Sequence, residues 1–275
     1  MLISVLTISM ALVESALLLF APELGLRLFW GLLIPVAPLL LFLAPGLWRQ
    51  ICPLGSVALL PRDLGWTAAS ARIPTEREGS ILRWVGLAAL LALPPLRPWF
   101  IDKSGLATFL VVLVFSGLAF FLGTRFVGRG AFCNGLCPVH FVEMIYGQFS
   151  RPLRLPVRCG SCDSCTTACV DVHEGRALDR GQDIYRHAAW GLPGFVIGWF
   201  LIPQDLGTFP LPALYGPTLG GFLASFLVFA GLDRVLGPSS RRGLVRAAAL
   251  LALGAYYWFQ VPRLACLWTN HLCLG

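Results

Sequence analysis

The stretch "GLATFLVVLVFSGLAFFLG", residues 105–123, carries no charged side chain. Its length is close to the roughly 20 apolar residues that a helix needs to cross the hydrocarbon core of a bilayer. The whole chain of 275 residues is 57% hydrophobic, with a mean hydropathy of +0.75, which is far outside the range of a soluble domain. The sequence therefore predicts an all-α integral membrane protein with membrane lipid around it.

Six other apolar segments resemble this one. The first lacks a basic flank and a convincing cleavage site, so we expect a retained helix rather than a signal peptide. The predicted fold is a polytopic transmembrane helical bundle of about seven spans. The expected spans are Leu2–Ala21, Leu26–Trp48, Ile81–Phe100, Gly105–Gly123, Ala188–Pro203, Tyr215–Leu232 and Leu244–Pro262.

The net charge of +7 sets the orientation of this bundle. In a soluble protein it would suggest nucleic acid, but no basic block is interleaved with aromatic residues here, so we expect no nucleic-acid partner. With the N-terminus inside, 17 arginines lie in the inner loops and their flanks. The outer segments hold only Arg27, Arg97, Lys103 and Arg263. This positive-inside bias predicts a cytoplasmic N-terminus and an outer C-terminus. We expect the membrane to be the bacterial inner (cytoplasmic) membrane, so that the outer side is the periplasm.

The chain then divides into three parts. Residues 1–123 hold four transmembrane helices and a first Cys-Pro loop. Residues 124–187 form a cytoplasmic, cysteine-rich loop, and residues 188–275 hold three helices and a periplasmic tail.

The cytoplasmic loop contains "RCGSCDSCTTACVD", residues 158–171, with the pattern C-x2-C-x2-C-x3-C. Short, turn-rich spacing lets a loop wrap an iron–sulfur cube. Zinc ribbons instead use two separated C-x2-C pairs. The pattern favours a ferredoxin-like [4Fe–4S] site over zinc, and its ligands would be Cys159, Cys162, Cys165 and Cys169.

A weak internal repeat carries the other inner cysteines. "LWRQICPLGSVALL" (residues 47–60) aligns with "FCNGLCPVHFVEMI" (residues 132–145). Each copy predicts a helix end, a Cys-Pro pair and a short surface helix. A cysteine before a proline-initiated helix lies near the positive helix end, which favours the thiolate and hence a soft-metal ligand. The candidates are Cys52, Cys133 and Cys137, although each could also be a buried cysteine beside an ordinary helix start.

On these motifs, the chain resembles the membrane ferredoxin family that includes NapH, the C-terminal membrane part of NosR, CcoG (RdxA) and MauN. The resemblance covers about residues 26–171. It implies electron transfer from quinol toward periplasmic reductases, or a role in maturing respiratory metal sites. The chain has one ferredoxin motif where NapH has two, and Trp48 stands in place of the first cysteine of the first C-x3-C-P.

The number of clusters stays open between three arrangements. In the first, the four loop cysteines hold one cluster. In the second, one cluster takes a Cys-Pro thiolate as a ligand. In the third, two clusters are bound, with one non-cysteine ligand such as His140 or Asp163. We expect a single cluster, because seven inner cysteines are one short of two all-cysteine cubes.

Other polar residues are weaker candidates. Glu14 lies inside an apolar span, where a carboxylate is costly and marks a functional site; it would accept a quinol proton, pair with Arg27 or face a partner subunit. His140 and His187 are candidates for a redox or proton role, or are interfacial polar residues. The histidine spacing argues against a membrane haem, and no covalent flavin is expected.

Cys266 and Cys273 lie in the predicted outer tail, and neither has the C-x-x-C-H spacing of haem attachment. An oxidising periplasm favours a disulfide between them.

The sequence thus favours an electron-transfer subunit of an oxidoreductase complex over a stand-alone enzyme. Its expected partners are other subunits of that complex and, as a candidate, quinone. The alternatives are an assembly or copper-reducing maturation factor, and a structural subunit whose cluster merely holds the inner loop.

Overall fold

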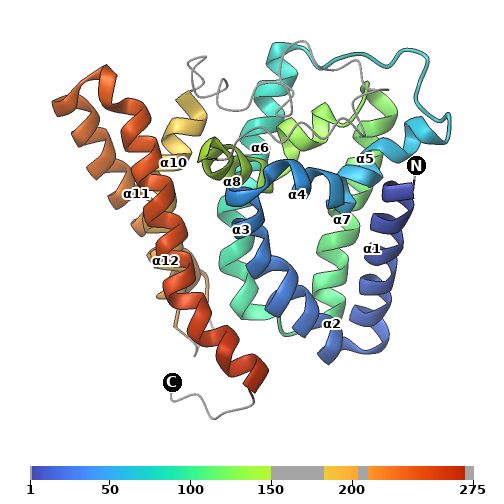
Figure 1. The fold of residues 1–275 in the computed structure, drawn as a ribbon, viewed down its shortest axis with the longest axis horizontal. Coiled ribbons are helices and arrows are strands. Elements are labelled where there is room, and N and C mark those ends of the chain that lie inside the picture. Colours follow the sequence, from blue (N-terminus) through green and yellow to red (C-terminus); the bar gives the residue numbers. More distant parts are fainter. Residues whose placement is uncertain (1, 150–182, 204–209, 270–275) are drawn as a thin grey trace. The chain divides into compact units, whose positions relative to one another are not determined.

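The computed structural model describes residues 2–149, 183–203 and 210–269, shown as coloured ribbons in Figure 1. These residues form helices and no β-strand. The α-helices are α1 (Leu2–Phe20), α2 (Pro22–Leu28), α3 (Ile34–Leu43), α4 (Pro45–Ile51), α5 (Pro53–Asp63), α6 (Glu76–Leu96), α7 (Gly105–Arg125), α8 (Val139–Tyr146), α10 (Asp183–Phe200), α11 (Leu211–Leu236) and α12 (Arg241–Thr269). The π-helical turns are η1 (Phe29–Leu33), η2 (Arg97–Ile101) and η3 (Phe132–Leu136); the 3₁₀ turns are η4 (Gly147–Phe149) and η7 (Pro238–Ser240).

Among the described residues, five segments are long and apolar enough to cross a membrane. They are Pro22–Leu43, Glu76–Ile101, Gly105–Arg125, Leu211–Leu236 and Pro238–Ala265. The first predicted span forms α1, whose apolar part Val5–Phe20 is shorter, and the fifth lies largely in α10, which is not among the five. The all-α, multi-pass prediction is confirmed, while the count of seven spans is not.

The helix surfaces carry large apolar side chains that water would not solvate well. Leu113 and Val114 of α7 are 51% and 58% exposed, and Val228 of α11 is 61% exposed. Exposed apolar side chains of this kind are typical of helices whose solvent is lipid. The structure therefore supports membrane lipid as the surroundings of these helices.

The second predicted span ends earlier than expected, at Leu43 rather than Trp48. Ala44 leaves the helical conformation, with φ −148° and ψ 63°, and Pro45 begins α4. A residue before proline is disfavoured in the helical region, whereas proline is well suited to the first helical position. This break is what starts the first Cys-Pro segment as a separate short helix.

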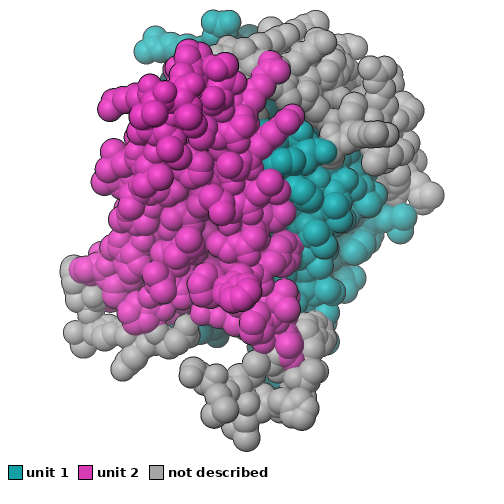
Figure 2. All heavy atoms as spheres, turned by 60° about the vertical axis from the view of Figure 1, so that its left-hand side comes forward, with its two compact units in different colours: residues 1–90, 101–180 teal, residues 91–100, 181–275 magenta. Residues whose placement is uncertain are grey.

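The chain divides into two compact units, shown in Figure 2. Unit 1 comprises residues 1–90 and 101–180, and unit 2 comprises residues 91–100 and 181–275.

Unit 1 is held by close backbone packing and by polar side chains that meet between helices. A Cβ atom at Gly123 of α7 would lie 2.2 Å from the carbonyl oxygen of Ala58 in α5, so only glycine permits this approach. The hydroxyls of Thr7 and Ser56 are 2.6 Å apart and join α1 to α5. In Figure 1, α4, α5 and α8 lie across the upper end of this unit.

Unit 2 is built on the contact between α10 and α11. A Cβ atom at Gly194 would lie 1.9 Å from the carbonyl oxygen of Gly221, and one at Gly198 would lie 2.1 Å from that of Pro217. Small residues four apart let membrane helices approach this closely. A buried cluster joins these helices to α12 and contains Trp190, Phe229, Leu244 and Ala248.

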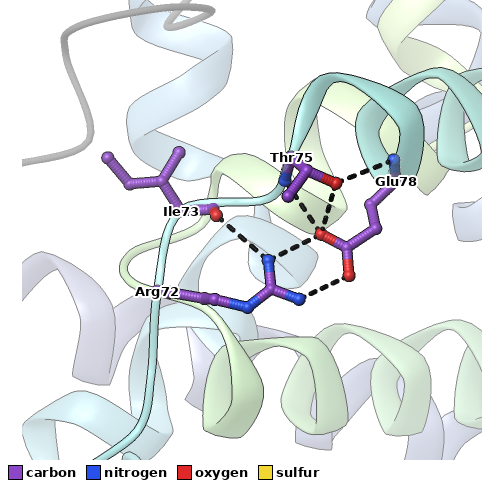
Figure 3. Close-up of polar contacts among 4 residues, drawn as sticks. All are labelled: Arg72, Ile73, Thr75 and Glu78. Atoms are coloured by element: carbon purple, nitrogen blue, oxygen red, sulfur yellow. Dashed lines mark hydrogen bonds and ion pairs between the residues drawn. The ribbon is translucent and has the colours of Figure 1, made fainter.

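Polar contacts fix the residue at which α6 begins, and Figure 3 shows them. The Thr75 amide donates to Glu78 Oε2 at 2.8 Å, and the Glu78 amide donates to Thr75 Oγ1 at 3.3 Å. The Arg72 guanidinium donates to both oxygens of the same carboxylate, at 2.7 and 2.6 Å. This reciprocal cap satisfies amides at the helix start that have no intrahelical partner.

We expect Gly194→Ala to lower the free energy of unfolding by about 1–3 kcal/mol, because the added methyl group collides with backbone. Gly220→Ala is the matched control, since no atom lies within 4 Å of a Cβ at that position. Thermal unfolding of the detergent-solubilised chain measures both. Equal melting temperatures for Gly194→Ala and the wild type would contradict the described contact.

Candidate metal centre at two cysteine–proline turns

Cys52 and Cys137 occupy equivalent places in the two copies of the repeat. Cys52 separates α4 from α5, and Cys137 separates η3 from Pro138, the residue before α8. Their backbone angles agree closely, with φ −65° and ψ 118° for Cys52 and φ −63° and ψ 120° for Cys137. Both copies thus contain a helix end, an extended cysteine, a proline and a short helix. The predicted local repeat is confirmed.

The amides that follow each cysteine–proline pair favour the thiolate, but burial outweighs them. Burial raises the pKa of Cys52, which the amides of Gly55 and Leu54 oppose. Burial also raises the pKa of Cys137 well above its ordinary value, against the amide of Val139. Leu54 and Val139 each lie two residues after their cysteine, so the two copies share this contact. A bound cation would reverse the balance, since metal ligation deprotonates a thiol outright.

Two of the three described inner cysteines lie beside Gly55. A Cβ atom at Gly55 would lie 3.8 Å from the Sγ of Cys133 and 3.9 Å from the Cβ of Cys52. After burial, the charges of Cys133 and Cys52 are the next causes that raise the pKa of Cys137. The missing side chain of Gly55 therefore leaves room beside the sulfur of Cys133 and the β-carbon of Cys52.

This donor set suits a soft metal, and it is incomplete. Thiolate ligands select iron–sulfur clusters, zinc or Cu(I), and a cubane cluster takes four of them. In the described residues, no three His, Cys, Asp or Glu side chains converge closely enough to hold a metal ion as they stand. A cluster or ion at Cys52, Cys133 and Cys137 thus needs side-chain rotation and a further ligand.

The remaining predicted cysteine ligands lie outside the described residues. They are Cys159, Cys162, Cys165 and Cys169. Cys273 is also outside, and Cys266 belongs to α12 but its side chain is not among those described. The ferredoxin-type loop and the tail disulfide stay predictions.

A buried ion pair connects the two turns, and sequence reasoning missed it. Arg49 precedes Cys52 in α4 and Glu143 follows Cys137 in α8; the Arg49 Nε donates to the Glu143 carboxylate. These residues are 7% and 8% exposed. Both residues lie inside the repeated segments. A charged residue within an otherwise apolar run was the sequence feature that could have indicated this pair.

Arg129 adds a second positive charge beside the thiols. Its Nη1 donates to the carbonyl oxygen of Arg49 at 3.0 Å, and lies 3.7 Å from where a Gly55 Cβ would be. Burial raises the pKa of Cys52. The charge of Arg129 opposes this rise, because it favours the thiolate. The guanidinium is thus placed to offset negative charge at the turn.

His140 lies three residues after Cys137, on α8, and is 2% exposed. Its amide donates to the carbonyl oxygen of Cys137 at 3.1 Å. Burial, together with the charges of Arg49 and Arg83, lowers the pKa of His140 to about 3. The imidazole is therefore neutral at physiological pH, the form in which histidine binds metals.

The two other candidate polar groups lie elsewhere. His187 is in unit 2, with ring centroids 5.7 Å from Trp190 and 5.4 Å from Phe226. Glu14 is in α1, where its Oε1 is buried with no hydrogen-bond partner in the described part of the chain. The suggested pair of Glu14 with Arg27 is not formed among these residues.

Comparison with known proteins gave no family: no protein-family model, no curated protein and no solved structure matched the chain.

We expect Gly55→Ala to lower metal affinity roughly tenfold, the scale on which residues supporting metal ligands act. The new methyl group would make only ordinary contacts of 3.7–3.9 Å, so the fold should persist while space beside the sulfurs is filled. Metal per purified chain, measured by mass spectrometry, tests this.

Gly130→Ala is the matched control for this substitution, because its Cβ would lie 3.8 Å from the amide nitrogen of Asn134 and near no sulfur. Metal retained equally in both variants would mean that the space beside Gly55 is not used.

Proposed function

We propose that this protein is a membrane-bound iron–sulfur electron-transfer subunit. It would pass electrons between the quinone pool, or a soluble donor, and a partner in a respiratory or other redox complex. The observation that carries the proposal is the gathering of Cys52, Cys133 and Cys137 at two like turns of a membrane helical unit. The cluster-type cysteine loop follows directly in the sequence.

The ligand chemistry of the cysteine side chains supports this proposal. A cubane cluster supplies reversible one-electron transfer when bound. Cys159, Cys162, Cys165 and Cys169 would hold one [4Fe–4S] cluster. The Cys-Pro thiols would shield it, donate its fourth ligand, or hold a second cluster with a non-cysteine ligand such as His140.

The charges around the turns would tune such a site. Thiolates and sulfides bring negative charge into a buried region, where its desolvation is costly. Arg129 favours the thiolate form of Cys52, and Arg49 is neutralised by Glu143. The charge of Arg129 beside Cys52 would help to stabilise the more negative, reduced state of a bound cluster.

The arginine distribution supports a cytoplasmic side for the two turns. Electrons that cross about 30 Å of hydrocarbon would need a further carrier, which we assign to a partner subunit. Glu14 would serve as a proton acceptor for quinol, because its buried oxygen has no hydrogen-bond partner among the described residues.

A second candidate function is maturation of a respiratory metal site by binding or reducing copper. The observation that favours it is the incomplete set of three soft thiols, since Cu(I) is well satisfied by few thiolates. Copper that co-purifies and is lost in Cys133→Ser, with no iron on the chain, would select this function.

The central test is metal content after anaerobic purification of the full chain. We expect about four irons per chain, as in one cubane, and bleaching of the visible absorption by a quinol analogue or an isolated partner. Cys162→Ser should lose nearly all iron, whereas the control Cys266→Ser should keep it. Iron-free wild-type protein would refute the proposal, and about eight irons would indicate a second cluster at Cys52, Cys133 and Cys137.

A separate measurement tests the orientation. After mild reduction of intact cells, a membrane-impermeant thiol reagent should label Cys266 or Cys273 and spare Cys159. Permeabilised cells provide the control in which all three positions should become accessible, provided that bound iron is first removed. Labelling of Cys159 alone in intact cells would reverse the topology.

A further inference from the structure

The two copies of the cysteine–proline repeat differ in the turn that leads into the cysteine before proline. In the first copy, the Cys52 amide donates to the carbonyl oxygen of Trp48, four residues earlier, at 2.8 Å. In the second copy, the Cys137 amide donates to the carbonyl oxygen of Phe132, five residues earlier, at 2.9 Å. The first turn is therefore α-helical, whereas the second is the π-turn η3. Single π-turns are frequent at functional sites.

The extra residue of the π-turn lies between Cys133 and Cys137. The Cys133 amide donates to the carbonyl oxygen of Arg129, four residues earlier, at 2.8 Å, so the hydrogen bonding is α-helical up to this cysteine. The length of the sequence does not explain the difference, because Trp48 and Cys133 each lie four residues before the Cys-Pro cysteine of their copy. A π-turn winds more residues into each turn than an α-helix does, so it changes the direction of Cys133 relative to that of Trp48.

Close packing against α6 holds the π-turn. A Cβ atom at Gly86 of α6 would lie 2.6 Å from the carbonyl oxygen of Gly135 and 3.0 Å from that of Leu136. A Cβ atom at Gly135 would in turn lie 2.9 Å from the Cβ of Leu82. Small residues let backbones approach this closely. The first copy carries Gln50 at the position of Gly135, so it is not built for the same contact.

Cys133 lies against the first copy rather than its own. Its Sγ is 3.8 Å from where a Gly55 Cβ would be, and the Cβ of Cys52 is 3.9 Å from the same point. The second copy carries His140 at the position of Gly55, and His140 is 2% exposed. The first copy thus leaves room for a sulfur where the second carries a buried imidazole.

We propose that the π-turn η3 places Cys133 beside Cys52, and that Gly86 is the positioning residue that keeps the turn in this form. Two unequal turns thereby supply one pair of thiols to a soft metal. In an α-helical form of the turn, Cys133 would point in another direction, and the ligand set would lose the member that joins the two copies. The inference rests on the proposed function only in treating Cys133 as a metal ligand.

The test is thiol–thiol cross-linking of the full chain in detergent after iron has been removed. Dibromobimane joins two neighbouring thiols, and peptide mass spectrometry identifies the pair. The wild type should link Cys52 to Cys133. Gly86→Ala should lose this link, because the added methyl group displaces the carbonyl oxygen of Gly135. Gly117→Ala in α7 is the matched control, since no atom lies within 4 Å of a Cβ there, and it should link as the wild type does.

A second variant keeps the test decisive if the melting temperature shows that Gly86→Ala does not fold. Trp48→Cys adds the cysteine that the first copy lacks, on a turn that is α-helical rather than π-helical. Its new thiol should therefore not link to Cys137 in the way that Cys133 links to Cys52.

Three results would overturn the inference. The wild type does not link Cys52 to Cys133, Gly86→Ala links them as the wild type does, or the new thiol of Trp48→Cys links to Cys137 equally well. Because iron is absent from this assay, none of these results bears on the proposed function. That function fails instead if wild-type protein purified without oxygen contains no iron.

Discussion

The buried ion pair between Arg49 and Glu143 is the constraint on which the candidate site depends. It joins the helix before one cysteine–proline turn to the helix after the other, across 94 residues of sequence. Removing one partner of a buried ion pair typically costs about 3–5 kcal/mol. The pair therefore ties the segment that carries Cys52 to the segment that carries Cys133 and Cys137.

The lipid environment explains why polar contacts and glycines carry so much of the helix packing. Lipid tails are as apolar as leucine, so burying leucine between helices gains little in a membrane. Unit 1 instead uses Thr7 with Ser56, and Trp30, whose indole donates to the Thr108 hydroxyl at 3.1 Å. Unit 2 uses the close approach at Gly194 and Gly198. Many large apolar residues face outward, as the exposure of Val114 and Val228 illustrates.

Burial at the two turns favours the protonated thiols over the thiolates. Helix-start amides at Leu54 and Val139 act on Cys52 and Cys137 in the same way, yet burial outweighs both. A soft metal that bound such thiols would displace their protons, so its affinity would rise with pH. Arg129 and neutral His140 are the nearby groups that would adjust this balance, one by its charge and the other as a ligand.

The sequence by itself determined the helical membrane class, the place of most spans and the two cysteine–proline turns. These features depend on local properties: apolar length, and the effect of proline on its own and the preceding residue, as at Ala44 and Pro45. The span ends were less predictable, because a helix in lipid ends where capping or a proline permits, as Thr75 and Glu78 show for α6. Only the tertiary structure brought Cys52 to Cys133 and paired Arg49 with Glu143. No local pattern encodes those contacts, because they arise when helices distant in sequence pack at glycines that leave no room for a side chain.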